Sequence, residues 1–317
     1  MIEFKHQPVL LNEVLEYLRP KAGGIYVDGT LGGGGHSEAI LRQTTDDKRP
    51  TIIGIDRDLE AIFAAKKNLA EFKDNMIFVH DNFFNLPAIL KSQGIEKVDG
   101  ILLDLGISSY QLENPNRGFS FQNDAPLDMR MDQSDDLTAA DIINFYDEKK
   151  LADLFYKYGE ERFSRRIARR IVERRGQNLR GQSPQRGLSP NSPSPITSGE
   201  LVEIIKKSTP PKYRYWQKIH FATRVFQALR IEVNNELNIL EDFIPGAAEL
   251  LKGDGVLTII SFHSLEDRIV KHSFRDLAEK NSEKYKVLTK KPLLPTEGEI
   301  AKNPRARSAK MRALEAN

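Results

Sequence analysis

The 317-residue sequence contains no cysteine. Without cysteine the chain cannot form disulfides, hold iron–sulfur clusters, bind zinc through thiolates or use a thiolate nucleophile. An excess of one charge is also missing, because 47 Lys and Arg against 45 Asp and Glu leave a formal net charge of +2. A nucleic-acid partner therefore has to be argued from local patches rather than from bulk charge.

Long apolar runs are missing as well. No run approaches the ~20 residues that a membrane helix needs, and the N-terminus lacks the charged-then-apolar pattern of a secretory signal. We therefore expect a soluble, cytoplasmic protein that does not bind membranes. With 39% hydrophobic and 29% charged residues, the chain can bury a core of ordinary size in one or two domains.

Short apolar runs that alternate with helical spacing fill the N-terminal third. Four near-continuous apolar runs predict strands at 24–28, 51–56, 76–79 and 98–104. Helical patterns follow the first three runs: one runs to about 43, and the others cover 59–72 and 86–93. This order predicts an α/β fold with a doubly wound, mostly parallel sheet covered by helices on both faces.

The strand–helix rhythm stops after about residue 112 and returns only with an apolar run at 255–262. We interpret 1–114 with 221–317 as one α/β domain, and 115–220 as an all-helical domain inserted into it. Within the insertion, 13 of the 24 residues from Gly176 to Gly199 are Gly, Pro or Ser. Such a composition cannot bury much apolar surface, so 176–199 is predicted to be a flexible loop.

The first predicted strand runs into a glycine-rich loop, 29–35, that contains five glycines. A tight strand-to-helix turn needs only one or two. Glycines at this place let backbone N–H groups and a helix N-terminus approach a ligand without interference from side chains. The loop therefore predicts a cofactor site, for which a dinucleotide and S-adenosylmethionine compete.

An acid that precedes the glycine loop distinguishes between the two candidate cofactors. Asp28 closes the first predicted strand, where its charge would repel the pyrophosphate of a dinucleotide. The same charge suits S-adenosylmethionine, which carries an ammonium and a sulfonium group and no phosphate. Asp56, closing the second strand, can accept hydrogen bonds from the ribose of either ligand and does not discriminate. The residues favour S-adenosylmethionine.

Several strings of residues, spread from end to end of the chain, carry a resemblance to a known family. The longer ones are DGTLGGGGHS at 28–37, DGILLDLGISSYQL at 99–112, PLDMRMD at 126–132 and SFHSLEDR at 261–268. Shorter ones are HQPVLL at 6–11, IDRD at 55–58, RGFSF at 117–121, YGEE at 158–161, FQALRI at 226–231 and NPRARS at 303–308. With these strings the sequence resembles the ribosomal small-subunit methyltransferase H (MraW) family, the 16S rRNA cytosine-N4 methyltransferases.

The resemblance implies a class I S-adenosylmethionine-dependent methyltransferase with a seven-stranded sheet and an inserted helical domain. It also implies methylation of the exocyclic N4 of a cytidine in the decoding region of 16S rRNA, within the small ribosomal subunit. Carried over motif by motif, the cofactor contacts fall on Gly34, Gly35, His36, Asp56, Phe83, Asp104 and Gln111. A departure is the Ser/Pro-rich stretch around 180–195, which looks longer than the family's usual link.

Methylation of a cytosine amino group needs a hydrogen-bond acceptor, because the nitrogen lone pair is delocalised into the ring. Asp104, at the end of the fourth predicted strand, is the candidate acceptor, with Ser108 or Ser109 assisting; Asp104 could also contact only the cofactor. The absence of cysteine excludes C5 methylation through a covalent adduct, radical transfer from a cysteine-held cluster and cysteine-ligated zinc deamination. Direct in-line transfer onto a heteroatom remains.

Two histidines invite other roles. His36 and His263 could act as general bases, although the methylated amine loses its proton easily and a lone histidine is more often structural. For His263 the working hypothesis is that it lines the target pocket. Asp128, Arg130 and Asp132 are either a salt-bridge cluster or part of the target site, and they lack the ligand spacing of a metal loop, so no metal site is predicted.

Charge is segregated along the chain. Residues 124–148 hold eight acids and one base, whereas 162–180 hold eight arginines and one acid. The arginine-rich segment either pairs with the acidic one or offers phosphate contacts. The run 302–312, with five bases and no acid, predicts a tail that binds phosphate groups of RNA. Tyr213, Tyr215 and Trp216 could stack an unpaired base, or Trp216 could pack in a core.

Two alternatives to an rRNA methyltransferase stay open. One is an S-adenosylmethionine enzyme that acts on a small molecule or a protein, which predicts activity without ribosomal RNA. The other is an RNA-binding ribosome-assembly factor with a vestigial cofactor pocket, which predicts binding without turnover. A target base must leave its stack to reach a buried donor, so an assembled subunit is the expected substrate. The sequence does not determine an oligomeric state.

Overall fold

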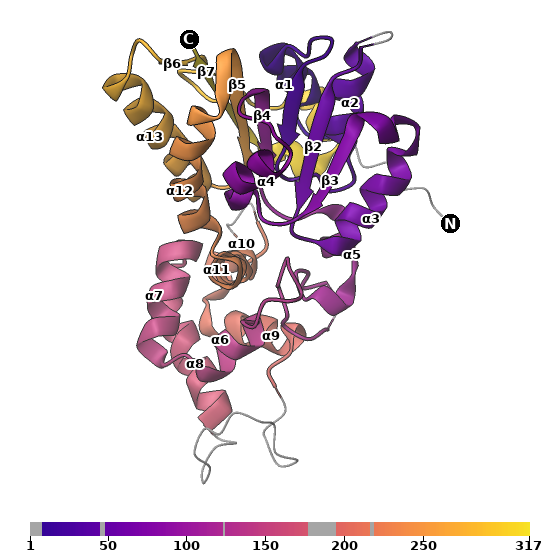
Figure 1. Cartoon of the computed structure of the whole chain (residues 1–317). Coiled ribbons are helices and arrows are strands. Elements are labelled where there is room, and N and C mark those ends of the chain that lie inside the picture. Colours follow the sequence, from indigo (N-terminus) through magenta and orange to yellow (C-terminus); the bar gives the residue numbers. More distant parts are fainter. Residues whose placement is uncertain (1–7, 45–47, 123, 177–194, 216–218) are drawn as a thin grey trace. The chain divides into compact units, whose positions relative to one another are not determined.

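The computed structural model describes residues 8–44, 48–122, 124–176, 195–215 and 219–317. The chain forms two compact units (Figure 1). The first unit combines Met1–Ser108 with Leu237–Asn317, and the second unit is Ser109–Glu236. The sequence-derived limits of the insertion, 115–220, remain a prediction; the compact second unit extends beyond them at both ends.

A seven-stranded sheet organises the first unit, in the order β3-β2-β1-β4-β5-β7-β6. The strands from β3 to β5 run parallel, and β7 runs antiparallel to both β5 and β6. The predicted doubly wound, mostly parallel α/β fold is confirmed. The strands are β1 (Ile25–Asp28), β2 (Thr51–Asp56), β3 (Met76–His80), β4 (Val98–Asp104), β5 (Leu251–Ser261), β6 (Tyr285–Val287) and β7 (Lys310–Ala316).

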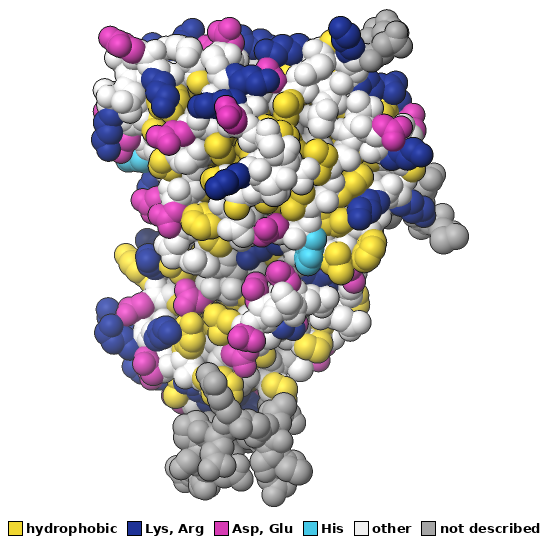
Figure 2. Space-filling view, in the orientation of Figure 1, with side chains coloured by type: hydrophobic (Ala, Val, Ile, Leu, Met, Phe, Trp, Pro, Cys, Tyr) yellow, Lys and Arg dark blue, Asp and Glu magenta, His cyan; other side chains and the backbone are white. Residues whose placement is uncertain are grey.

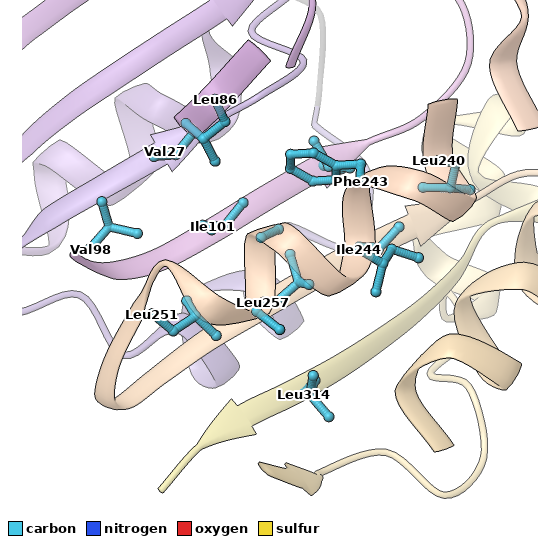
Figure 3. Close-up of a cluster of buried hydrophobic side chains, with 14 of the residues drawn as sticks. Val27, Leu86, Val98, Ile101, Leu240, Phe243, Ile244, Leu251, Leu257 and Leu314 are labelled. Carbon is cyan, nitrogen blue, oxygen red and sulfur yellow. The ribbon is translucent and has the colours of Figure 1, made fainter. Parts of the chain in front are cut away.

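Helices cover both faces of the sheet because side chains alternate along each strand. In β4, for example, Ile101 and Leu103 enter one core and Leu102 enters the other. The first core takes side chains from α4, α12 and α13 (Figure 3), and the second from α1, α2 and α3. These helices are α1 (Leu11–Leu18), α2 (Gly35–Gln43), α3 (Leu59–Asn68), α4 (Leu86–Ser92), α12 (Glu236–Glu249) and α13 (Ser264–Lys280).

Two boundaries, one of a helix and one of a strand, differ by several residues from the sequence expectation. The predicted helix 59–72 ends at Asn68, and the 3-10 turn η1 (Ala70–Asn75) follows it. The last long strand begins at Leu251 rather than near 255. The remaining short elements of the first unit are η2 (Phe83–Asn85), α14 (Glu297–Lys302) and η4 (Pro304–Ser308).

The expectation of a phosphate-gripping tail at 302–312 is wrong for its last residues. Strand β7 lies inside the sheet, between β5 and β6. Arg312 is 5% exposed, and its Nε donates to Asp267 Oδ1 at 2.7 Å, while Lys310 Nζ lies 3.3 Å from Asp267 Oδ2. The sequence misleads here because polar residues alternate with small apolar ones, and the sheet neighbours that bury them come from distant segments.

The described part of the second unit contains helices and no strand. Its helices are α5 (Ser109–Glu113), α6 (Ala139–Phe145), α7 (Glu148–Gly159), α8 (Ser164–Gly176), α9 (Ser198–Ser208), α10 (Pro211–Tyr215) and α11 (Thr223–Asn234), with the 3-10 turn η3 (Pro115–Arg117). Of the predicted flexible loop 176–199, residues 177–194 lie outside the described residues. Both ends of that range are helical instead: Gly176 ends α8, and Ser198 and Gly199 begin α9.

Across the described ranges, no helix combines the length and the apolar character that crossing a membrane requires.

Candidate active site

Three acids end three neighbouring parallel strands of the first unit. Asp28 closes β1, Asp56 closes β2 and Asp104 closes β4, and β1 lies between the other two strands. The carboxyl ends of parallel strands meet at one edge of a sheet, where open α/β folds bind ligands. The three sequence-selected acids therefore share one edge, next to the glycine loop.

Glycines in the loop 29–35 let neighbouring side chains pack closely against the backbone, in addition to leaving the edge of the sheet open to a ligand. A Cβ on Gly34, whose φ is +83°, would lie 2.6 Å from Leu69 Cδ1, and a Cβ on Gly35 would lie 2.6 Å from Pro8 Cγ. A Cβ on Gly32, whose φ is +51°, would lie 3.9 Å from Thr30 O, and the Gly32 N–H donates to Asp56 Oδ2 at 2.8 Å. The loop is thus tied to strand β2 through its backbone.

Asp28 is buried and held by hydrogen bonds. Ser37 Oγ donates to Asp28 Oδ2 at 2.7 Å, and the Thr30 N–H donates to Oδ1 at 3.3 Å. Burial raises the pKa of Asp28 to about 6, and these two hydrogen bonds oppose the rise. The carboxylate is therefore ionised at neutral pH at an energetic cost, which a nearby cation would offset.

Asp56 is held in the same way. Its Oδ1 accepts from the Asp58 N–H at 2.9 Å, and Oδ2 accepts from Gly32. Burial raises the pKa of Asp56 to about 6, and the charges of Asp58 and Asp28 add to the rise. Each carboxylate oxygen keeps a second lone pair, so Asp56 can still accept hydrogen bonds from hydroxyl groups.

Asp104 differs from the other two acids because it lacks donors. Its Oδ1 is buried and has no hydrogen-bond partner among the described residues. Burial raises the pKa of Asp104 well above its usual value, and the charges of Asp28 and Glu266 raise it further. The strand end is fixed from the other side, since the Asp104 N–H donates to Thr30 Oγ1 at 2.6 Å.

His36 lies beside Asp104 but does not supply the missing donor. A carbonyl oxygen only accepts, so the 2.9 Å contact between His36 Nε2 and Val9 O places the proton on Nε2. Burial lowers the pKa of His36 to about 4, so the ring is neutral at pH 7 and Nδ1 is an acceptor. Nδ1 lies 3.8 Å from Asp104 Oδ2, where two acceptors face each other.

His263 has a clear structural task. It is the N-cap of α13: Nδ1 accepts from the Glu266 N–H at 3.4 Å, and Glu266 Oε2 accepts from the N–H groups of Phe262 and His263. Nε2 lies 3.2 Å from Glu266 Oε1, and Glu266 is 2% exposed. This capping box accounts for the position of His263, and its role in a target pocket remains a prediction.

The other predicted residues fall in three places. Phe83 begins η2 and packs edge-on against Phe243, with ring centroids 4.9 Å apart, close to where a Cβ on Gly29 would lie. Ser108 is the last residue of the first unit and is half-buried. Gln111 belongs to the second unit and is 3% exposed.

Sequence reasoning missed three residues that hold the acids in place. Ser37 bonds Asp28, Thr30 bonds the backbone of Asp104, and Glu266 adds a buried negative charge near it. Ser37 and Thr30 stand inside the glycine-loop string, but a hydroxyl in a loop gives no signal of its partner. Together the edge holds four carboxylates, and burial disfavours the charged forms of Asp28, Asp56 and Asp104. Such a site attracts a cation and offers a free acceptor.

Comparison with known proteins decides between the chemistries that such an edge allows. Residues 3–317 match the MraW methylase family. The chain belongs to this family. Its relatives named "Ribosomal RNA small subunit methyltransferase H" include one from Carboxydothermus hydrogenoformans, 49% identical over 99% of this chain and 98% of that protein. Another, from Trichormus variabilis, is 51% identical over 98% of this chain and 92% of that protein.

A solved rRNA methylase from Streptococcus thermophilus aligns with 100% of this chain and 98% of that chain, at 10% identity and a TM-score of 0.43. The sheet of the first unit has the strand order of a class I methyltransferase, with β7 antiparallel between β5 and β6, which agrees with the family.

Membership of the MraW methylase family identifies S-adenosylmethionine as the cofactor, which confirms the cofactor prediction. The residues of the edge fit this molecule. The buried acids Asp28 and Asp104 favour a ligand with positive charge, and Asp56 retains acceptor capacity for ribose hydroxyls. The same acids would repel the negatively charged pyrophosphate of a dinucleotide.

In the second unit, Asp128 and Arg130 form an ion pair. Arg130 Nε donates to Asp128 Oδ1 at 2.9 Å, and Nη2 donates to Oδ2 at 2.7 Å. Burial alone would raise the pKa of Asp128, but the bonds from Arg130 lower it overall.

Tyr213 also has a structural task, because its hydroxyl lies 3.0 Å from both carboxylate oxygens of buried Glu161. Tyr215 is 86% exposed, and Trp216 lies outside the described residues.

Proposed function

We propose that the chain transfers the methyl group of S-adenosylmethionine directly to the exocyclic N4 of a cytidine in the decoding region of 16S rRNA. Two supports come from outside the site: the family is a methylase family, and the relatives at about 50% identity carry a small-subunit rRNA methyltransferase name. The site observation that carries the proposal is the buried Oδ1 of Asp104, which has no donor among the described residues.

Asp104 supplies what an amino group needs. The cytosine N4 lone pair is delocalised into the ring, so the nitrogen attacks only when its N–H groups are held and the lone pair is turned toward the methyl carbon. The positive charge of the bound cofactor opposes the raised pKa of Asp104 and favours its charged form. A carboxylate oxygen without a donor can then accept one of these N–H groups, and a charge-assisted bond of this kind is stronger than a neutral one. Fixing the nitrogen in line can be worth ~7–11 kcal/mol of barrier.

The remaining groups assist by holding charge and geometry. S-adenosylmethionine, when bound, supplies an electrophilic methyl group on a sulfonium. Asp28 and Asp56 stabilise positive charge at the edge, and Thr30 fixes the backbone at Asp104. Neutral His36, with its proton committed to Val9 O, leaves Asp104 free of a competing donor. Proton loss from the methylated amine needs no dedicated base.

Asp104→Ala and Asp104→Asn test the assignment. Either variant should fold and should lower kcat by about 100-fold or more, since loss of one group that holds the reacting atoms costs that much. Labelled S-adenosylmethionine is supplied with unmethylated small subunits or naked 16S rRNA, and nucleosides are mapped by mass spectrometry. Asp99→Asn is the matched control: it lies on the same strand, and its carboxylate is bound by Lys252 and by the Ile25 N–H.

Label on cytidine N4 supports the proposal, and label on another atom or on a non-RNA substrate contradicts it. Calorimetric titration with S-adenosylmethionine separates the two roles of Asp104. Lost kcat with an unchanged cofactor Kd supports the acceptor role, whereas a weakened Kd with kcat restored at saturating cofactor reduces Asp104 to a cofactor contact. Binding of rRNA without turnover by the unmodified protein would favour the assembly-factor alternative.

A further inference from the structure

Helix α8 of the second unit has one buried face and one cationic face. Ile167, Ala168 and Ile171 are fully buried, as the helical spacing predicts. The opposite side carries four exposed arginines, called here the arginine face: Arg165, Arg166, Arg169 and Arg170. On the side of this unit that Figure 1 labels α7 and α8, Lys and Arg side chains lie among Asp and Glu side chains (Figure 2).

The acidic segment 124–148 does not neutralise the arginine face. Asp128 binds Arg130, Asp141 forms a capping box with Thr138, and Asp147 caps α7. Among the described residues, the arginine face has one ion pair with this segment, from Arg169 Nε to Glu148 Oε1 at 3.7 Å, between two exposed side chains. Pairing with the acidic segment therefore does not explain the four arginines.

The helices packed against α8 supply no further partner. On α7, Asp153 binds Lys149 at 3.0 Å. On α9, Glu203 binds Lys206, and Glu200 binds Arg174 at the far end of α8. The acid of α8 itself, Glu173, is exposed and makes no ion pair with a described residue. Arg165, Arg166 and Arg170 are thus left without an acid among the described residues.

The C-terminal end of the same helix shows the contrast. Arg174 pairs with Glu200, and Arg175 donates to the carbonyl oxygens of Ile143 and Tyr146, where α6 ends. These two arginines hold the second unit together. On the arginine face the contacts are weaker: the Arg166 guanidinium lies 5.7 Å from the centroid of the Phe163 ring, and Arg169 has its exposed pair with Glu148. Like charges four residues apart, as in Arg165 with Arg169 and Arg166 with Arg170, destabilise a helix by about 0.2–0.5 kcal/mol per pair.

We propose that the arginine face binds the phosphate backbone of the ribosomal RNA substrate. This inference rests on the proposed function, which makes the partner an RNA. Guanidinium groups bind phosphate oxygens through two parallel N–H donors, and the spacing along the helix places two pairs of them about 6 Å apart. Such contacts position a nucleic acid without reading its sequence. The arginine face therefore holds the RNA on the enzyme, while the sheet edge with Asp28, Asp56 and Asp104 selects the base.

A fourfold substitution tests the proposal on the full chain: Arg165→Gln, Arg166→Gln, Arg169→Gln and Arg170→Gln together. The probe is the unmethylated small ribosomal subunit, whose Kd is measured between 50 and 200 mM KCl. Four phosphate contacts contribute about −3.6 to the slope of log K against log salt, or about 100-fold in affinity across this range. The variant should lose a slope of about this size and should show raised KM with kcat unchanged at saturating subunit.

Two further variants separate charge from structure. Lysines at the same four positions should keep most of the salt slope, because a lysine still neutralises a phosphate. A control with Lys67, Lys91, Lys271 and Lys280 of the first unit changed to Gln should keep the unmodified Kd and slope; all four are exposed and none forms an ion pair with a described residue. The Kd for S-adenosylmethionine should be the same in all variants, which also verifies folding.

The outcomes distinguish the two proposals. If the unmodified protein methylates subunits and the Gln variant binds them with unchanged Kd and slope, the inference is wrong and the proposed function stands. If the Gln variant loses the slope but no protein methylates rRNA, the phosphate contact stands and the proposed function is wrong. Loss of binding by the Lys variant as well, with an unchanged salt slope, would indicate a structural role and overturn the inference.

Discussion

Replacing Asp28 with Asn should stabilise the cofactor-free protein and weaken cofactor binding at the same time. Asp28 is 1% exposed, and its pKa is raised from 3.8 to about 6 because burial penalises the charge. Asn keeps the shape: its carbonyl oxygen can accept from the Thr30 N–H, and its amide can donate to Ser37 Oγ. The substitution therefore removes mainly the buried charge.

The pKa shift of Asp28 gives both the size and the sign of the expected change in the free energy of unfolding. A carboxyl whose pKa is higher in the folded state binds its proton more tightly there, so ionising it above pH 6 costs about 2–3 kcal/mol of folding stability. This cost falls to about 1 kcal/mol at pH 4.5 and disappears as both states become protonated. Asp28→Asn should thus raise the free energy of unfolding by about 2–3 kcal/mol at pH 7.5 and by much less at pH 4.5.

Cofactor binding should change in the opposite direction. An opposite charge a few ångströms away in a partly buried site is worth about 1.4 kcal/mol or more, so the Kd for S-adenosylmethionine should rise about 10-fold or more at pH 7.5. Because a protonated Asp28 or Asp56 attracts the cation less, the affinity of the unmodified protein should itself increase between pH 5 and pH 7.

The assay is urea denaturation of the cofactor-free protein at both pH values, with calorimetric titration of S-adenosylmethionine. The matched control is Asp99→Asn, at the start of the same sheet's β4. Burial alone would raise the pKa of Asp99, but bonds from Lys21 and Lys252 lower it, so that the substitution should destabilise at pH 7.5. If Asp28→Asn destabilises equally at both pH values, or leaves the cofactor Kd unchanged, the buried-charge argument is refuted.

Two further predictions concern the packing of the first unit. Gly34→Ala should lower the free energy of unfolding by about 1 kcal/mol more than Gly94→Ala, since both have positive φ but only Gly34 would press a Cβ against Leu69; equal losses in urea denaturation would contradict this. Asp267→Asn should cost about 3 kcal/mol, because it leaves the buried guanidinium of Arg312 without its charge partner, and a loss under 1 kcal/mol would show that β7 does not depend on the pair.

Local pattern predicted a large part of this structure. Strands β2 and β4 begin and end where the apolar runs do, because a buried parallel strand must be apolar along its whole length. The acids Asp28, Asp56 and Asp104 could be selected for the same reason, since each interrupts such a run at its carboxyl end. The buried face of α8 followed from the spacing of Ile167 and Ile171.

The sequence by itself therefore determined the α/β class, the family and the acids that end β1, β2 and β4. Only the tertiary structure decided how those acids differ: Asp28 is held by Ser37, whereas Asp104 Oδ1 has no donor in the described part of the chain. It also moved Arg312 from an expected tail into the sheet, and among the described residues it gave the arginine face a single ion pair, between Arg169 and Glu148. The physical reason is that strand period and chain direction are local properties, whereas burial, pKa and pairing depend on neighbours that arrive from distant segments.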